Sequence, residues 1–275
     1  MTSLLAGGLA AAAEKILRTG DPDEKAKLSR ATASEWQSRR AADECPEIGQ
    51  ASPPDRPARP DLPVLKHPRD MPRRRPGSTT GRVALLHAVA HIELNAIDLH
   101  WDIVARFGEV DLPTGFHDDW VSAADDESKH FMLLCDRLKA HDAHYGALDA
   151  HAGMWDAALE TSEDLVGRLA IVPMVLEARG LDVTPAMIKT FQKADDPETV
   201  SALETIYTEE VAHVAFGSKW FNFLCGRENC DPKIRFHGLV RTYFKGALKP
   251  PFNDEKRAEA GIPLDFYWPL VDEAS

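Results

Sequence analysis

The chain has 275 residues, of which 44% are hydrophobic, and this is enough apolar material for a large packed core. Its net charge of −12 excludes a uniformly basic nucleic-acid-binding protein. There is no apolar run of 18 or more residues, so we expect no membrane span, and the four cysteines lack the spacing of a disulfide framework, which favours the cytoplasm.

The first 45 residues predict a pair of helices. Residues 1–18 form a short helical pattern that ends before Gly20, and the Asp21-Pro22 pair starts a second helix that runs to about Ala42. The apolar run in the first pattern has no Lys or Arg before it, so we do not expect a signal peptide.

Residues 46–80 predict a proline-rich basic linker. Nine prolines between residues 46 and 76 exclude a regular helix and indicate an extended connection. From Arg56 to Arg82, eight Lys or Arg against two Asp give a net charge of +6, so the rest of the chain carries −18. Such a segment could bind an RNA, pack on the acidic remainder of the chain, or stay solvated.

Residues 81–248 predict an all-α four-helix bundle. Its long helical patterns cover residues 81–106, 117–142, 154–180 and 198–226. The connection from Gly108 to Gly115 is short, so the first two helices should be antiparallel neighbours. The 13 residues of 141–153 are long enough for a crossover along the bundle, and a plain up-and-down connection also fits.

The third of these patterns is irregular. Gly180 and Pro185 predict that the helix ends soon after Glu177, and Thr184–Ala194 would then form a short helix that folds back. Pro173 should kink the helix one turn before Glu177.

The chain closes with a further helix, from Pro232 to about Leu248, and a tail. We expect residues 249–275 to wrap around the body of the protein, and a partner-binding motif is the alternative. The aromatic anchors expected in this tail are Phe266, Tyr267 and Trp268.

One arrangement of acids and histidines occurs twice. Glu93 is followed after 34 residues by Glu127-x-x-His130, and Glu177 is followed after 33 residues by Glu210-x-x-His213. Residues three apart share a helix face, so each Glu-x-x-His motif points a carboxylate and an imidazole the same way. Four carboxylates balance two divalent cations, and the pattern therefore predicts a two-metal site with these six ligands.

The Glu-x-x-His motifs alone are a weak signal, because 19 Glu and 11 His in this chain give roughly one such motif by chance. The neighbours of the acids are more informative. All four acids interrupt apolar helix stripes, such as Leu86, Val89 and Ile97 around Glu93. A buried acid needs a partner, so ordinary buried ion pairs are the alternative to a metal.

Two further residues lie on the ligand faces. His100 follows Glu93 by two helical turns, and it could support a ligand, contact a substrate, or be a buried structural histidine. Tyr207 precedes Glu210 by one turn, and it could hydrogen-bond a ligand, carry a radical, line a substrate pocket, or simply belong to the core.

Other ligand-type residues do not fit this site. His87 and His91 are four apart, but His91 lies about 200° around the helix from Glu93. Cys225 and Cys230 have no second cysteine pair, so they do not indicate a zinc site.

Four stretches carry a resemblance to a known superfamily: HIELNAIDLHWDI, DDESKHFMLL, VLEARGLDVTP and TEEVAHVAFG. With the six ligands, they resemble the ferritin-like di-metal carboxylate superfamily. The closer resemblance, over about residues 80–248, is to an uncharacterised bacterial ferritin-like family distantly similar to the tRNA-modifying non-haem di-iron hydroxylases. It implies a ferritin-like bundle that binds two iron ions, with manganese as the alternative.

The resemblance also implies an oxygen-activating oxidoreductase of the hydroxylase or monooxygenase type, with an electron donor and a small-molecule or nucleoside substrate. A modified nucleoside in tRNA is one candidate, with Arg56–Arg82 as the RNA contact. Because the superfamily includes several functions, non-catalytic iron oxidation, storage or buffering is the alternative.

Overall fold

The computed structural model describes residues 3–72 and 77–271. Within these residues there is no strand, only one isolated bridge between Leu65 and Ala150, so the all-α prediction is confirmed. The chain divides into two compact units, Met1–Trp155 and Asp156–Ser275, with the boundary inside the short helix α5 (Gly153–Leu159). The single bundle expected over residues 81–248 spans both units and stays a prediction.

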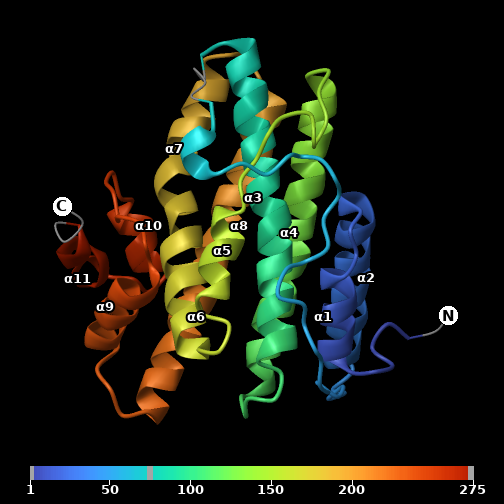
Figure 1. Cartoon of the computed structure of the whole chain (residues 1–275), viewed down its shortest axis with the longest axis vertical. Coiled ribbons are helices and arrows are strands. Elements are labelled where there is room, and N and C mark those ends of the chain that lie inside the picture. The colour runs from blue at the N-terminus through green and yellow to red at the C-terminus, as the bar shows by residue number, and fades with distance from the viewer. Residues whose placement is uncertain (1–2, 73–76, 272–275) are drawn as a thin grey trace. The chain divides into compact units, whose positions relative to one another are not determined.

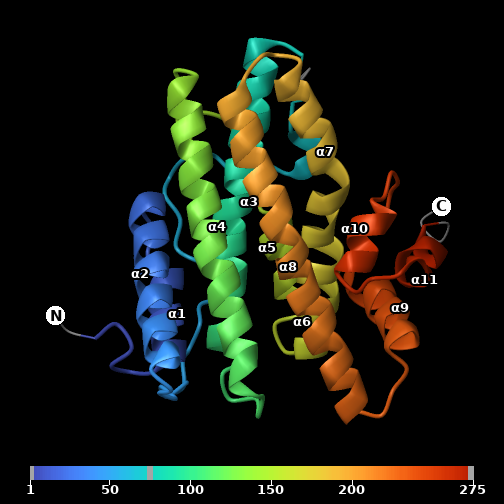
Figure 2. The same ribbon diagram turned by 180° about the vertical axis from the view of Figure 1, so that it is seen from behind.

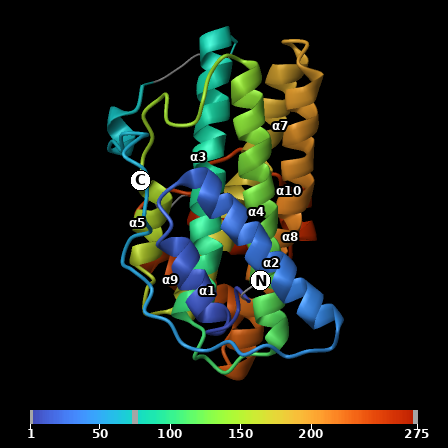
Figure 3. The same cartoon turned by 90° about the vertical axis from the view of Figure 1, so that its right-hand side faces the viewer.

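The first unit is built on two long helices, with two shorter ones against them. Its described elements are α1 (Leu9–Leu17), α2 (Pro22–Ala41), the 3-10 helix η1 (Pro68–Asp70), α3 (Thr79–Arg106) and α4 (Thr114–Ala140). α3 packs along α4, with α1 against α3 and α2 against α4 (Figures 1 and 2). Figure 3 shows α1 and α2 lying across this pair. The first helix begins only at Leu9, later than expected.

The proline-rich linker is held to α1 by backbone hydrogen bonds. The amides of Leu9 and Ala10 donate to the carbonyls of Glu47 (3.0 Å) and Ile48 (2.8 Å), which satisfies two N–H groups at the start of the helix. Gly8 permits this approach. Its φ is 87°, and a Cβ there would lie 2.8 Å from the Ile48 oxygen.

A buried ion pair ties α2 and the linker to α3. Lys25 Nζ lies 2.5 Å from Asp98 Oδ1, and the two side chains are 2% and 0% exposed. Lys25 also donates to the carbonyl of Ala58 (3.0 Å), while Arg59 lies 3.7 Å from Asp98 and donates to Asn95 Oδ1 (2.6 Å). Burial raises the pKa of Asp98 and lowers that of Lys25, and the opposite charge of the partner opposes each shift.

The second unit has a long helix, α8, with other helices packed on it. The described elements after α5 are α6 (Leu165–Ile171), the π-helix η2 (Val172–Glu177), α7 (Ala178–Gln192), α8 (Pro197–Arg227), α9 (Pro232–Tyr243), α10 (Asp254–Glu259), α11 (Leu264–Tyr267) and the 3-10 helix η3 (Trp268–Leu270). α6, η2 and α7 all pack on α8 (Figures 1 and 2). Among the described residues, no helix is both long enough and apolar enough to cross a membrane.

The prediction of one helix over residues 154–180 is wrong in its first half. α5 ends at Leu159, and α6 begins where the Asp164 side chain accepts the amide of Gly167 at 2.8 Å. Thr161 and the polar residues around it favour such local bonds over a continuous helix. The turn after α5 is also held by buried Arg168, which donates to Thr161 Oγ1 at 2.9 Å.

The predicted end of this helix near Gly180 is also wrong, because α7 runs through both Gly180 and Pro185. Pro185 lacks the amide that would donate to the carbonyl of Leu181. Asn253 of the C-terminal tail donates its side-chain amide to that carbonyl instead, at 3.2 Å. The fold-back helix expected at Thr184–Ala194 is therefore absent, and those residues largely continue α7.

The tail is fixed to α7 by a buried charge pair. Arg257 Nε and Nη2 donate to the two carboxylate oxygens of Asp182 at 2.8 and 2.7 Å. The guanidinium also lies 4.7 Å from the centre of the Tyr267 ring, which suits a cation–π contact. The expected anchors differ: Phe266 and Tyr267 are buried, whereas Trp268 is 42% exposed and is not an anchor.

Candidate metal centre

Three predicted ligands meet in the first unit, where α3 packs on α4. Glu93, Glu127 and His130 each offer one ligand atom, and these atoms lie within 4.8 Å of one another. His130 Nδ1 is 3.3 Å from Glu93 Oε2 and 3.4 Å from Glu127 Oε2. All three side chains are buried. The prediction that these acids face inward is therefore correct.

The two carboxylates of this group disfavour each other's charge. Burial and then the Glu127 carboxylate raise the pKa of Glu93 well above its ordinary value, and contact with His130 opposes that rise. A cation bound between the acids would remove the repulsion. Carboxylate oxygen and imidazole nitrogen suit divalent iron, manganese or zinc.

His100 contacts the ligand group from within the first unit. Its Nε2 lies 3.4 Å from Glu127 Oε1, whereas His130 approaches the other oxygen of that carboxylate. The His100 ring stacks on Trp120, with ring centres 5.4 Å apart, and both rings are buried. Sequence reasoning missed Trp120, although it precedes Glu127 by two turns of α4 and so lies on the same face.

The second unit carries the other three predicted ligands. Glu210 and His213 lie one turn apart on α8, with His213 Nδ1 3.8 Å from Glu210 Oε2, and both are buried. Glu177 is the last residue of the π-helix and is also buried. Among the described residues, Glu177 belongs to no group of three or more ligand atoms within 4.8 Å.

A π-helix replaces the kink that Pro173 predicts. Such segments are rare and frequently occur at functional sites. This one packs closely on α8 because Gly217 has no side chain, and a Cβ there would lie 2.4 Å from Pro173 Cβ and Cγ. Gly217 follows His213 by one turn. The contact thus holds the segment that bears Glu177 against the helix that bears His213.

Tyr207, predicted on the ligand face of α8, contacts the tail. Its hydroxyl accepts a hydrogen bond from Asn253 Nδ2 at 2.6 Å, and the ring is partly buried. The tail therefore reaches α8 one turn before Glu210.

The histidines that the sequence excludes from the site have structural contacts. His91 Nδ1 is 2.8 Å from the Tyr145 hydroxyl, and Nε2 is 3.0 Å from the His151 carbonyl. His87 Nε2 accepts the amide of Gly146 at 2.9 Å. Both histidines fix the segment that follows α4.

The basic segment Arg56–Arg82 is partly neutralised by the chain itself. Arg59 lies beside buried Asp98, and Lys66 Nζ is 2.6 Å from Asp149. Its most basic stretch, residues 73–75, lies outside the described residues.

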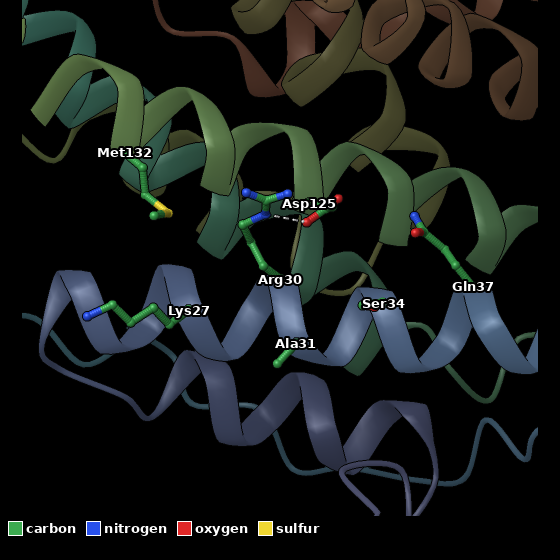
Figure 4. Close-up of a pocket in the computed structure, with 7 residues that line it drawn as sticks. All are labelled: Lys27, Arg30, Ala31, Ser34, Gln37, Asp125 and Met132. Atoms are coloured by element: carbon green, nitrogen blue, oxygen red, sulfur yellow. Dashed lines mark hydrogen bonds and ion pairs between the residues drawn. The ribbon is translucent and has the colours of Figure 1, made fainter. Parts of the chain in front are cut away.

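A surface hollow of about 480 Å³ lies between α2 and α4 (Figure 4). Arg30 and Asp125 form an ion pair across it at 3.0 Å. Its lining residues are Lys27, Arg30, Ala31, Ser34, Gln37, Asp125 and Met132. None of the predicted ligands lines it, so the hollow is separate from the candidate metal centre.

Comparison with known proteins places the chain in a family. Residues 18–268, which include all six predicted ligands, match the family described as "Protein of unknown function (DUF455)". The chain is 35% identical over 255 residues to an uncharacterized protein of Haemophilus influenzae, covering 90% of this chain and 88% of that relative. No solved structure matches it. The chain therefore belongs to the family of proteins of unknown function DUF455.

Proposed function

We propose that this protein is a ferritin-like, non-haem di-iron oxidoreductase, of the oxygen-activating hydroxylase or monooxygenase type. The observation that carries the proposal is the buried group of Glu93, Glu127 and His130. Two carboxylates and an imidazole in a water-poor place fit a divalent transition metal by donor type. Without a cation, the burial of two adjacent acids is unfavourable.

The ligand roles follow the repeated motif. Glu127 and His130 would hold one ion, Glu210 and His213 the other, and Glu93 and Glu177 would be terminal or bridging ligands. The pairing of both motifs in one centre rests on their nearly equal spacing and on charge, because four carboxylates neutralise two divalent cations. Iron is preferred over manganese because of the family resemblance.

When bound, the metal pair would supply the redox chemistry with oxygen. The chain itself excludes water from the ligands, since Glu127 and His130 are 0% exposed. His100 contacts Oε1 of the Glu127 carboxylate, and the Trp120 ring stacks on the His100 ring. These contacts orient the ligand. Six protein ligands would not fill the coordination of two such metal ions, which would leave positions for oxygen or substrate.

The proposal includes an external electron donor and a small-molecule or nucleoside substrate. A tRNA substrate bound through Arg56–Arg82 has less support than a small molecule, because Asp98 and Asp149 contact Arg59 and Lys66 within the chain. An acidic protein also repels nucleic acid.

Metal analysis tests the centre. After anaerobic loading with iron(II) and desalting, we expect about two metal ions per chain. Glu127→Gln should lose at least one of them, because a neutral amide is a poor ligand. Asp136→Asn, at an exposed acid of the same helix, should keep both. Wild-type protein that binds no metal would contradict the proposal.

Two further measurements separate catalysis from iron handling. The reduced, iron-loaded protein should consume oxygen, and a substrate should stimulate this consumption. Accumulation of many iron ions per chain would instead indicate storage. Comparison of metabolites and tRNA nucleosides from cells with and without the gene should reveal a compound that lacks one hydroxyl group when the gene is deleted.

A further inference from the structure

Helix α8 ends in a cap that brings two cysteines together. Asn229 is left-handed, with a φ of 54°. Its amide donates to the carbonyl of Gly226 at 3.2 Å, and the amide of Cys230 donates to the carbonyl of Cys225 at 3.0 Å. These two bonds with a left-handed residue between them form a Schellman motif, in which the side chains at the ends of the longer bond contact each other. Here those side chains are the two thiols.

The two thiols differ in access to solvent. Both thiols are free and adjacent to each other in the cap, but Cys225 is fully buried and Cys230 is only partly buried. Burial and then the Cys230 thiol raise the pKa of Cys225 to about 12. Thiolate is the reactive form of cysteine, and Cys225 is both buried and hard to deprotonate. An external reagent should therefore react with Cys230 first.

We propose that Cys225 and Cys230 form a reversible intramolecular disulfide by exchange with a low-molecular-weight disulfide such as oxidised glutathione. The Cys230 thiolate attacks one sulfur of the reagent, which forms a mixed disulfide and releases one glutathione thiolate. That thiolate takes up the proton that Cys230 lost.

In the second step, the sulfur of Cys225 attacks the sulfur of Cys230. The bond between Cys230 and glutathione breaks, and the released glutathione thiolate takes up the proton of Cys225. The two cysteines together lose two electrons and two protons, and one oxidised glutathione becomes two reduced ones.

The disulfide would lie at the C-terminal end of α8, the helix that carries Glu210 and His213. Cys225 follows His213 by 12 residues, which corresponds to about 18 Å along a helix. The thiol pair is therefore a separate site, and it does not depend on the proposed metal chemistry.

Peptide mapping of the whole protein tests the proposal. Wild-type protein is equilibrated with mixtures of reduced and oxidised glutathione, alkylated and digested. We expect both cysteines of the peptide that contains residues 225–230 to escape alkylation, and that peptide to be lighter by two hydrogens than its reduced form. Glutathione that stays on Cys230, or a pair that stays reduced while exposed Cys45 is fully glutathionylated, would overturn the proposal.

Two variants assign the roles. Cys225→Ser should retain glutathione on Cys230, because no second thiol can displace it. Cys135→Ser changes another buried cysteine and should leave the 225–230 cross-link unaltered. Loss of the cross-link in Cys135→Ser, or no glutathione on Cys230 in Cys225→Ser, would overturn the assignment.

The contribution of the helix cap is measured separately. Because the fold already holds the thiols in contact, the equilibrium constant for disulfide formation should be at least about tenfold larger in the native protein than in urea. Asn229→Gly should preserve this advantage, whereas the β-branched Asn229→Val should reduce it. If the equilibrium constant for disulfide formation were equal or smaller in the native protein than in urea, the cap would not favour the disulfide between Cys225 and Cys230.

Discussion

The contact between Gly217 of α8 and Pro173 of the π-helix can be tested with one methyl group. In Gly217→Ala, the new Cβ would lie 2.4 Å from both Cβ and Cγ of Pro173. Carbon atoms in contact lie about 3.5–4.0 Å apart, so α8 or the π-helix must move. The proline ring is locked to its backbone and cannot rotate away.

The expected cost follows from this rigidity. Overpacking costs typically about 1–3 kcal/mol, and a rigid partner places this contact at the upper end. Alanine is better than glycine inside a helix by about 1 kcal/mol, which offsets part of the loss. We therefore expect Gly217→Ala to lower the free energy of unfolding by about 2 kcal/mol, or Tm by roughly 4–8 °C.

Gly180→Ala is the matched control. Gly180 lies inside α7 in the same unit, and a Cβ there meets nothing within 4 Å. This variant should be more stable than wild type by about 1 kcal/mol. Urea unfolding followed by circular dichroism measures both variants. If Gly217→Ala were as stable as Gly180→Ala, α8 and the π-helix would not pack as described.

Substitutions at three other sites test polar contacts by urea unfolding. Burial lowers the pKa of His91 to about 4. Below about pH 6.5, the unfolded chain therefore binds a proton at this histidine, whereas the folded chain does not. The protonation of His91 in the unfolded chain should lower the free energy of unfolding by about 2 kcal/mol between pH 7 and pH 5. His91→Gln should remove this contribution to the pH dependence. Lys25→Met leaves buried Asp98 without its lysine and should cost about 3 kcal/mol, whereas adding Asp98→Leu should restore much of the loss. Asn253→Ala removes the donor to Leu181 and the cap of α10, and it should cost about 2 kcal/mol. Asn253→Asp keeps the cap and should cost about half as much.

Each of these expectations has a contradicting result. An unaltered pH dependence in His91→Gln would show that this ring is not the group held neutral. A double variant less stable than Lys25→Met alone would show that Asp98 does not need its lysine. Equal losses in Asn253→Asp and Asn253→Ala would assign the whole effect to the amide donors.

The sequence alone determined the features that depend on neighbouring residues. The Asp-Pro pair at Asp21 predicted a helix start, and this aspartate caps its helix through the amide three residues on. The apolar stripes around Glu93 and Glu127 predicted that these acids are buried, and the Glu-x-x-His spacing placed His130 beside them. Each of these signals involves residues that lie within one or two helical turns of each other.

Only the tertiary structure decided features that join distant parts of a unit. Pro185 would normally end a helix, but Asn253 satisfies the freed carbonyl of Leu181 from 72 residues further along the chain. The π-helix at Pro173 depends equally on a glycine of another helix. Local propensities amount to about 1–3 kcal/mol per residue, so a hydrogen bond or a close packing contact made by a remote residue is enough to override them.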